Sequence, residues 1–200
     1  MAEPQIPQVQ EPQLKLDEFV HHPKLPETQL SQWLDNALDR FGIIISWLWV
    51  VLMLVIIVNV FMRYALGRGL IVFEEIQWHI YSIGFLIGLS HCLVHDSHVR
   101  VDILYDRMSP RTQAWMELIG MLVFLLPFAV IVVIYAIPFA VNSFAVGEVS
   151  DSPGGLPYRW VIKAVLPISF VLLWLAAFSR LLRASALLFG VPKPLPGQQH

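Results

Sequence analysis

Four long stretches of the chain contain no charged residue, and this feature constrains the fold more than any other. They cover residues 41–62, 76–94, 118–147 and 164–179, with 22, 19, 30 and 16 residues respectively. A helix needs about 20 apolar residues to cross the hydrocarbon core of a bilayer, which is about 30 Å thick. The sequence therefore predicts an all-α membrane protein with four transmembrane helices, the last of which is the shortest.

The composition agrees with a membrane protein and excludes several other classes. Hydrophobic residues make up 56% of the 200 residues and charged residues 14%, against about 25% charged residues in a typical soluble protein. The 13 Lys and Arg against 15 Asp and Glu leave no basic excess, so no nucleic-acid partner is expected. A single cysteine, Cys92, excludes an intramolecular disulfide and a zinc site made of cysteines alone.

Prolines and charges suggest where the last two spans bend and end. In the third stretch we expect Pro127 to kink the helix and Pro138 to mark its exit from the membrane. The fourth stretch lies between Lys163 and Arg180, whose long side chains are expected to reach the membrane surface, while Trp160 anchors the same helix.

The segments outside the spans are predicted from composition and periodicity. Residues 1–27, rich in Pro and Gln, read as a disordered cytoplasmic tail without the features of a cleaved signal peptide, and residues 186–200 as a second cytoplasmic tail. Residues 28–40 are predicted to form an amphipathic helix, capped by Thr28 or Ser31, that lies on the cytoplasmic membrane surface and turns into the first span. Its apolar stripe is Leu30, Trp33, Leu34, Ala37, Leu38 and Phe41. Residues 41–185 then form the four-helix transmembrane domain.

Lys and Arg also predict the orientation. With a cytoplasmic N-terminus, nine of them fall in cytoplasmic segments and four in outside loops. Positively charged residues are enriched in the cytoplasmic connections of membrane proteins. Both termini are therefore expected in the cytoplasm.

The apolar stretches lack the features of a complete carrier or an enzyme. None has an ionisable Asp, Glu, Lys or Arg in its interior, and no matched pair of Gly- or Pro-broken segments indicates an inverted repeat. The chain also lacks the H-E-x-x-H, G-x-S-x-G and G-x-x-x-x-G-K-[ST] motifs. We therefore expect a non-catalytic subunit of a larger membrane assembly, with no cofactor.

The histidines leave two alternatives open. His91, His95 and His98 are spaced to share one helix face and could hold a metal, although the favoured interpretation is that they mark the cytoplasmic end of the second span. Haem in a helical bundle needs ligands on facing helices, whereas His79 and His91 both lie in the second stretch. A cytochrome-b-like anchor of an electron-transfer complex is the main alternative function.

Two glycines in the second stretch form a G-x-x-x-G pattern. Gly84 and Gly88 would allow a second helix backbone to approach closely. The neighbouring helix could belong to this chain or to another subunit, and the sequence alone does not favour either.

Short motifs at the ends of the stretches follow one another in a specific order. They are Asn59-Val-Phe-Met-Arg63-Tyr64, Glu74-Glu75, Gly84-Phe-Leu-Ile-Gly88, His98-Val-Arg-Val-Asp102, and the segment from Glu148 through Pro153 and Pro157 to Lys163. This series resembles the DctQ-like family, the small membrane subunit of tripartite ATP-independent periplasmic (TRAP) transporters. The resemblance covers about residues 41–185.

The resemblance implies partners and a location. Such a subunit lies in the bacterial inner membrane, paired with a large DctM-like membrane subunit that carries substrate and sodium. A periplasmic substrate-binding protein delivers an organic acid to the pair. The small subunit would have a scaffold role, in contact with the lipid bilayer, the large subunit and the binding protein.

Several residues are candidates for contacts with loops or subunits. Arg63 and the pair Glu74 and Glu75 lie at opposite ends of the first outside loop. Three alternatives are open for these charges: they pair with each other, they pair with charges of a partner, or they stay solvated. His98 and Asp102 are expected to hold the cytoplasmic connection on the membrane surface. The turn-rich loop from Pro153 to Pro157 is a candidate contact for the binding protein.

Overall fold

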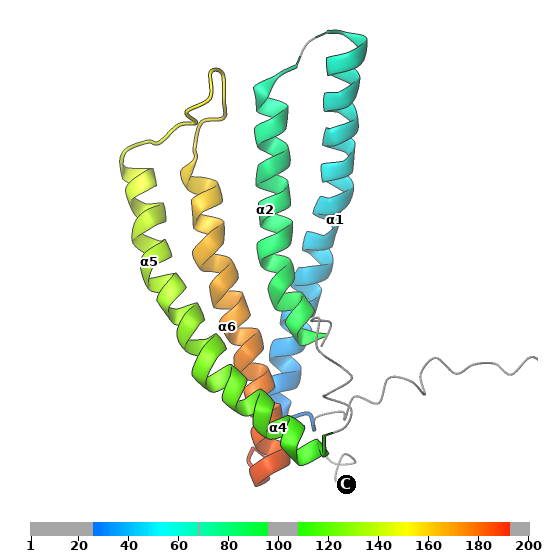
Figure 1. Cartoon of the computed structure of the whole chain (residues 1–200), viewed down its shortest axis with the longest axis vertical. Coiled ribbons are helices and arrows are strands. Elements are labelled where there is room, and N and C mark those ends of the chain that lie inside the picture. The colour runs from blue at the N-terminus through cyan, green and yellow to red at the C-terminus, as the bar shows by residue number, and fades with distance from the viewer. Residues whose placement is uncertain (1–25, 68, 96–107, 193–200) are drawn as a thin grey trace, which may run out of the picture.

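The computed structural model describes residues 26–67, 69–95 and 108–192, and these residues form an all-helical bundle (Figure 1). The helices run alternately up and down, so the start of the first and the end of the last lie at the same end of the bundle. No strand occurs in the described ranges. The elements are α1 (Gln29–Ala65), α2 (Ile71–Val94), α4 (Pro110–Ile119), the π-helix η2 (Gly120–Leu125), α5 (Leu126–Ala145) and α6 (Trp160–Phe189).

Three helical segments are long and apolar enough to cross a membrane. They are α1, the continuous rod made by α4, η2 and α5, and α6. α2 has 24 residues and is therefore about 36 Å long at 1.5 Å per residue, but its glutamates and histidines make it less apolar. Three of the four predicted spans are thus confirmed as helices of membrane-spanning length and composition, while a span through α2 remains a prediction.

α1 is one helix where the sequence predicted a surface helix followed by a separate first span. It runs unbroken from Gln29 to Ala65, so the predicted turn between a surface helix over residues 28–40 and the first span is wrong. Thr28 caps it as expected, since its Oγ1 accepts from the Ser31 amide at 3.2 Å. The straight continuation is stabilised because Leu34 and Leu38, from the predicted membrane-facing stripe, are buried inside the bundle.

The rod of α4, η2 and α5 continues past the residue where the sequence predicted its end. Pro138 lies inside α5, which continues to Ala145, so the predicted exit at Pro138 is wrong. Pro127 is the second residue of α5, just beyond the end of η2, and the whole rod bows along its length (Figure 1). Proline has no amide hydrogen to donate, and a π segment is one local adjustment by which a membrane helix accommodates that loss.

α6 is longer than the fourth apolar stretch. It begins at Trp160, carries Pro167 within it, and ends at Phe189, where it is capped by Gly190, whose φ of 69° is left-handed. Arg180 therefore lies inside the helix, and its side chain is 9% exposed rather than extended to the membrane surface as predicted. It stays inside because polar partners from two neighbouring helices meet it there.

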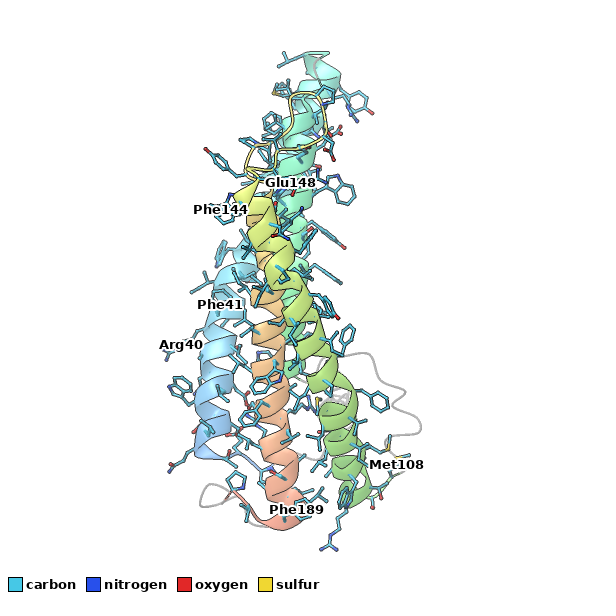
Figure 2. The ribbon with its side chains drawn as sticks, turned by 90° about the vertical axis from the view of Figure 1, so that its left-hand side faces the viewer. Arg40, Phe41, Met108, Phe144, Glu148 and Phe189 are labelled. Atoms are coloured by element: carbon cyan, nitrogen blue, oxygen red, sulfur yellow. The ribbon has the colours of Figure 1, made fainter. Side chains whose placement is uncertain are left out.

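The helices pack through small side chains and expose large ones. α5 and α6 meet along buried alanines, which allow their backbones to approach closely. The central apolar cluster is Leu38, Leu93, Leu173, Ala176 and Ala177. Large apolar side chains such as Trp47, Phe124 and Tyr135 point outward. Figure 2 places Phe144 and Glu148 at one end of the bundle, called the loop end below, and Met108 and Phe189 at the other, called the terminal end.

Candidate functional site

Glu75 connects α2 to the loop between α5 and α6 at the loop end. Its carboxylate accepts hydrogen bonds from the Leu156 amide, at 2.5 Å, and from the Ser150 hydroxyl. The Leu156 amide and then the Ser150 hydroxyl hold the pKa of Glu75 below its ordinary value of 4.5, since both stabilise the charged carboxylate. The start of α2 is thereby joined to a segment about 80 residues further along the chain.

A glycine makes this contact possible. A Cβ on Gly155 would lie 2.7 Å from the Glu75 carboxylate and 2.6 Å from the Ser150 side chain. Gly154 beside it adopts a left-handed φ of 76°, which glycine accepts without strain. The loop can therefore fold tightly over the carboxylate only with glycine at these positions.

Glu148 closes the same loop onto α6. It pairs with Lys163, and Arg159 lies 3.6 Å from its carboxylate. The Lys163 hydrogen bond holds the pKa of Glu148 below its ordinary value, because it stabilises the charged carboxylate. The Lys163 ammonium also lies 4.1 Å from the centre of the Phe139 ring. This contact ties α5, the loop and α6 together.

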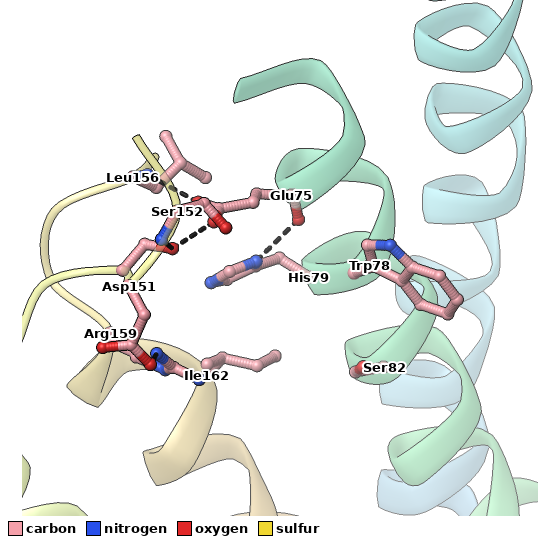
Figure 3. Close-up of a pocket in the computed structure, with 10 residues that line it drawn as sticks. Glu75, Trp78, His79, Ser82, Asp151, Ser152, Leu156, Arg159 and Ile162 are labelled. Carbon is pink, nitrogen blue, oxygen red and sulfur yellow. Dashed lines mark hydrogen bonds and ion pairs between the residues drawn. The ribbon is translucent and has the colours of Figure 1, made fainter. Parts of the chain in front are cut away.

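A cavity of about 320 Å³ opens between α2 and this loop (Figure 3). His79 points from α2 toward the loop, and its Nδ1 donates to the Glu75 carbonyl at 2.7 Å. Arg159 pairs with Asp151 at 2.9 Å on the facing side. The lining combines both signs of charge with apolar surface and comprises Glu75, Trp78, His79, Ser82, Ser150, Asp151, Ser152, Leu156, Arg159 and Ile162.

The loop between α1 and α2 carries an exposed ion pair. The Arg63 guanidinium lies 2.5 Å from the Glu74 carboxylate, and both side chains are about half exposed. Of the alternatives open from the sequence, the structure has Arg63 paired with Glu74, whereas Glu75 binds the distant loop instead.

At the terminal end, a buried arginine joins three helices. The Arg180 guanidinium donates to the Leu93 carbonyl and pairs with Glu117, each at 3.0 Å, and both side chains of the pair are 9% exposed. Leu93 lies in α2, Glu117 in α4 and Arg180 in α6. A charge this deep is tolerated because it is paired and hydrogen-bonded.

A second arginine, one turn further along α6, holds the start of α1. Arg183 pairs with Asp35, and Glu27 lies 3.8 Å away. The Ser179 hydroxyl donates to the Ser31 carbonyl at 3.3 Å. These polar contacts explain why the first turns of α1 stay in the bundle instead of turning away from it.

A third group brings two of the predicted histidines to α1. Asp39 Oδ1 lies 2.6 Å from His95 Nε2 and 3.6 Å from His91 Nδ1. The His91 ring packs against Gly42, where any Cβ would overlap it. The potential ligand atoms of these three residues all lie within 4.8 Å of one another.

The comparison with known families decides the identity. Residues 52–187 match the family described as the DctQ component of tripartite ATP-independent periplasmic transporters. The chain belongs to the DctQ family. A curated protein of Haemophilus influenzae, provisionally named a TRAP transporter small permease protein, is 26% identical over 144 residues, which cover 72% of this chain and 88% of that protein. No solved structure gives a significant match.

DctQ membership makes the chain a TRAP transporter component and a multi-pass protein of the bacterial inner membrane. Members of this family generally associate with a large TRAP membrane subunit and a binding protein. Neither comparison supports the cytochrome-b-like alternative.

The two glycines of the G-x-x-x-G pattern have different surroundings in this DctQ chain. A Cβ on Gly84 would lie 3.3 Å from the Trp49 ring of α1, so Gly84 serves packing within the chain. A Cβ on Gly88 would meet no heavy atom within 4 Å. Packing within the chain, one of the two interpretations that the sequence left open, therefore applies to Gly84. Gly88 has room for a neighbouring helix, and a contact there with another subunit stays a prediction.

The remaining candidate residues are at the loop end or beyond the described ranges. Pro153 and Pro157 are exposed on the loop that Glu75 holds. His98 and Asp102 lie outside the described residues, so their predicted contacts stay predictions.

Sequence reasoning missed the contacts that join the helices. Arg180 was expected only to mark the end of the fourth apolar stretch, and no contact was predicted for Glu117, Asp35 or Asp39. The sequence did contain one signal for the position of Arg180. Gly190 is a residue type that commonly ends a helix, and a last helix that runs up to it contains Arg180.

Proposed function

We propose that this chain is the scaffold subunit of a sodium-coupled TRAP transporter that takes up an organic acid delivered by a periplasmic binding protein. The DctQ match over residues 52–187 is the observation that carries the proposal. It fits a bundle whose charged contacts tie its own helices together and whose outer faces are apolar. A rigid frame is what a moving large subunit requires.

The proposed orientation has four spans, with both termini in the cytoplasm. α2 runs beside α1 and α6 over about 36 Å, enough for the hydrocarbon core. With this span, the α1–α2 and α5–α6 loops face the periplasm, and nine Lys and Arg against four lie on the cytoplasmic side.

Within this orientation, the α5–α6 loop is the proposed contact for the binding protein. Its exposed Pro153 and Pro157 flank the turn, and the cavity beneath offers both signs of charge to a partner side chain. The loop is held by Glu75 and Glu148, so a partner would meet a shaped surface.

Reconstituted transport tests the proposal. The chain, the large membrane subunit and the binding protein from the same source would be placed in liposomes, and uptake of labelled organic acids would be measured with and without a sodium gradient. We expect sodium-dependent uptake only when all three are present, and the large subunit should co-purify with this chain.

A double variant separates the scaffold role from loop contacts. Pro153→Ala with Pro157→Ala should slow uptake at low binding-protein concentration but leave co-purification of the large subunit unchanged. Full uptake by the large subunit and binding protein alone would contradict the scaffold proposal.

A further inference from the structure

Asp39, His91 and His95 form a compact group of metal-binding side chains between two helices. His91 and His95 are one turn apart on α2, with ring centres separated by 4.5 Å, and Asp39 faces them from α1. All three side chains are partly buried, between 32% and 49% exposed. The group lies at the terminal end of α2, away from the cavity described above.

One nitrogen atom of this group lacks a hydrogen-bond partner. His91 Nδ1 is enclosed and has no hydrogen-bond partner, although it lies 3.6 Å from the Asp39 carboxylate. A buried ring nitrogen without a partner destabilises the fold, so such an atom calls for an explanation. Gly42 brings this nitrogen toward α1, because any side chain at that position would push the ring away.

The spacing of the three ligand atoms suits a small metal ion. Bonds of about 2.0–2.1 Å from zinc to nitrogen or oxygen place neighbouring ligand atoms of a tetrahedral site about 3.3 Å apart. The distances from Asp39 Oδ1 to the two histidines, 2.6 Å and 3.6 Å, lie on either side of that value. Small side-chain rotations would therefore equalise them around an ion.

We propose that Asp39, His91 and His95 bind one divalent transition-metal ion, with zinc as the best fit. Two imidazoles and one carboxylate form a donor set that zinc accepts in proteins, with a water molecule as fourth ligand. The ion would give His91 Nδ1 its missing partner and join α1 to α2. This proposal concerns the chain itself and does not depend on the transport function.

Metal titration of the purified full-length chain tests the site. The chain would carry an affinity tag without histidine, be stripped with a chelator in detergent, and be titrated with Co²⁺ and Zn²⁺. We expect one equivalent of Co²⁺ per chain with visible absorption bands that Zn²⁺ displaces, and a higher unfolding temperature with Zn²⁺.

Three variants and one control locate the ion. Losing even an outer-shell partner weakens metal affinity by about 10–100-fold, so His91→Ala, His95→Ala and Asp39→Asn should each weaken it at least that much. His79→Ala, on the same helix but at the loop end, should bind like the wild type. His95 is half exposed, so its variant is expected to fold even if His91→Ala does not.

Two results would overturn the proposal. One is no saturable binding by a folded wild-type chain. The other is binding that a folded His95→Ala variant retains unchanged, because the ion would then lie elsewhere.

Discussion

Two ionised side chains, Glu75 and Arg180, join segments of the chain that are far apart in the sequence. Glu75 is accessible and holds a loop through hydrogen bonds to its charged form. Arg180 is buried, where removing one member of a charge pair costs far more than at the surface. The two residues should therefore respond differently to substitution.

Glu75→Gln should change how stability depends on pH. The pKa of Glu75 is lowered in the folded chain, so its contribution is complete above the ordinary value of 4.5 and is lost as the pH falls through the lower folded value. In detergent, the wild type should unfold at a higher temperature than the variant above about pH 5, and the gap should narrow as the pH falls below 4.5.

Glu74→Gln is the matched control for this measurement. Glu74 is the neighbouring carboxylate and pairs with the exposed Arg63 instead of the distant loop. Its variant should follow the wild-type pH profile. A Glu75→Gln profile that also matched the wild type would rule out a role for the Glu75 charge in holding the loop.

Arg180→Met should destabilise the chain strongly because it leaves Glu117 charged and buried. The expected loss is about 3–5 kcal/mol in the free energy of unfolding. The double variant Arg180→Met with Glu117→Leu should recover most of this loss, whereas Arg63→Met, at an exposed pair, should cost at most about 1 kcal/mol. Equilibrium unfolding in mixed detergent measures all three, and equal effects of Arg180→Met and Arg63→Met would contradict the buried pair.

At the scale of elements, α2 carries two glycines whose surroundings differ. One face packs against α1 and α6, and Gly84 lies there under the Trp49 ring. The position of Gly88 is open to a Cβ. The same motif therefore combines an internal contact with a site free for another helix.

Gly84→Leu and Gly88→Leu should separate these two contacts. Leucine at residue 84 would press on Trp49 and cost about 1–3 kcal/mol of overpacking, lowering the unfolding temperature of the isolated chain. Leucine at residue 88 should leave that temperature unchanged and, if this face meets the large subunit, reduce its co-purification. A stable Gly88→Leu chain with full recovery of the large subunit would remove Gly88 from the interface.

At the scale of the whole molecule, the number of spans decides on which sides the termini lie. Three spans would put the two ends of the chain on opposite sides of the membrane, whereas four return them to the same side. In the bundle, the start of α1 and the end of α6 lie at the same end, with α2 running between (Figure 1). This arrangement favours four crossings.

Reporter fusions test the crossing number directly. A reporter fused after Gly190 should be active only if it functions in the cytoplasm, and one inserted after Gly154 only if it functions in the periplasm. Activity of a periplasmic reporter after Gly190, with a cytoplasmic N-terminus, would show an odd number of spans and exclude α2 as one of them.

The sequence by itself determined the helical class and the approximate positions of the helices. Membrane crossing depends on length and apolarity, which are local properties, so residues 41–62 and 118–147 could be recognised without any partner. Their ends were less predictable. Pro138 continues a helix and Arg180 lies inside one, because neighbouring helices can satisfy backbone and charged groups that a single segment leaves unsatisfied.

Only the tertiary structure decided which polar groups meet. Glu117 and Arg180 are 63 residues apart in the chain, and Glu75 and Leu156 are 81 apart. No periodicity within one helix can reveal such pairs, since they depend on which helices become neighbours and at what height. The unbroken α1 has the same origin, because the residues that hold its first turns, Ser179 and Arg183, belong to the last helix.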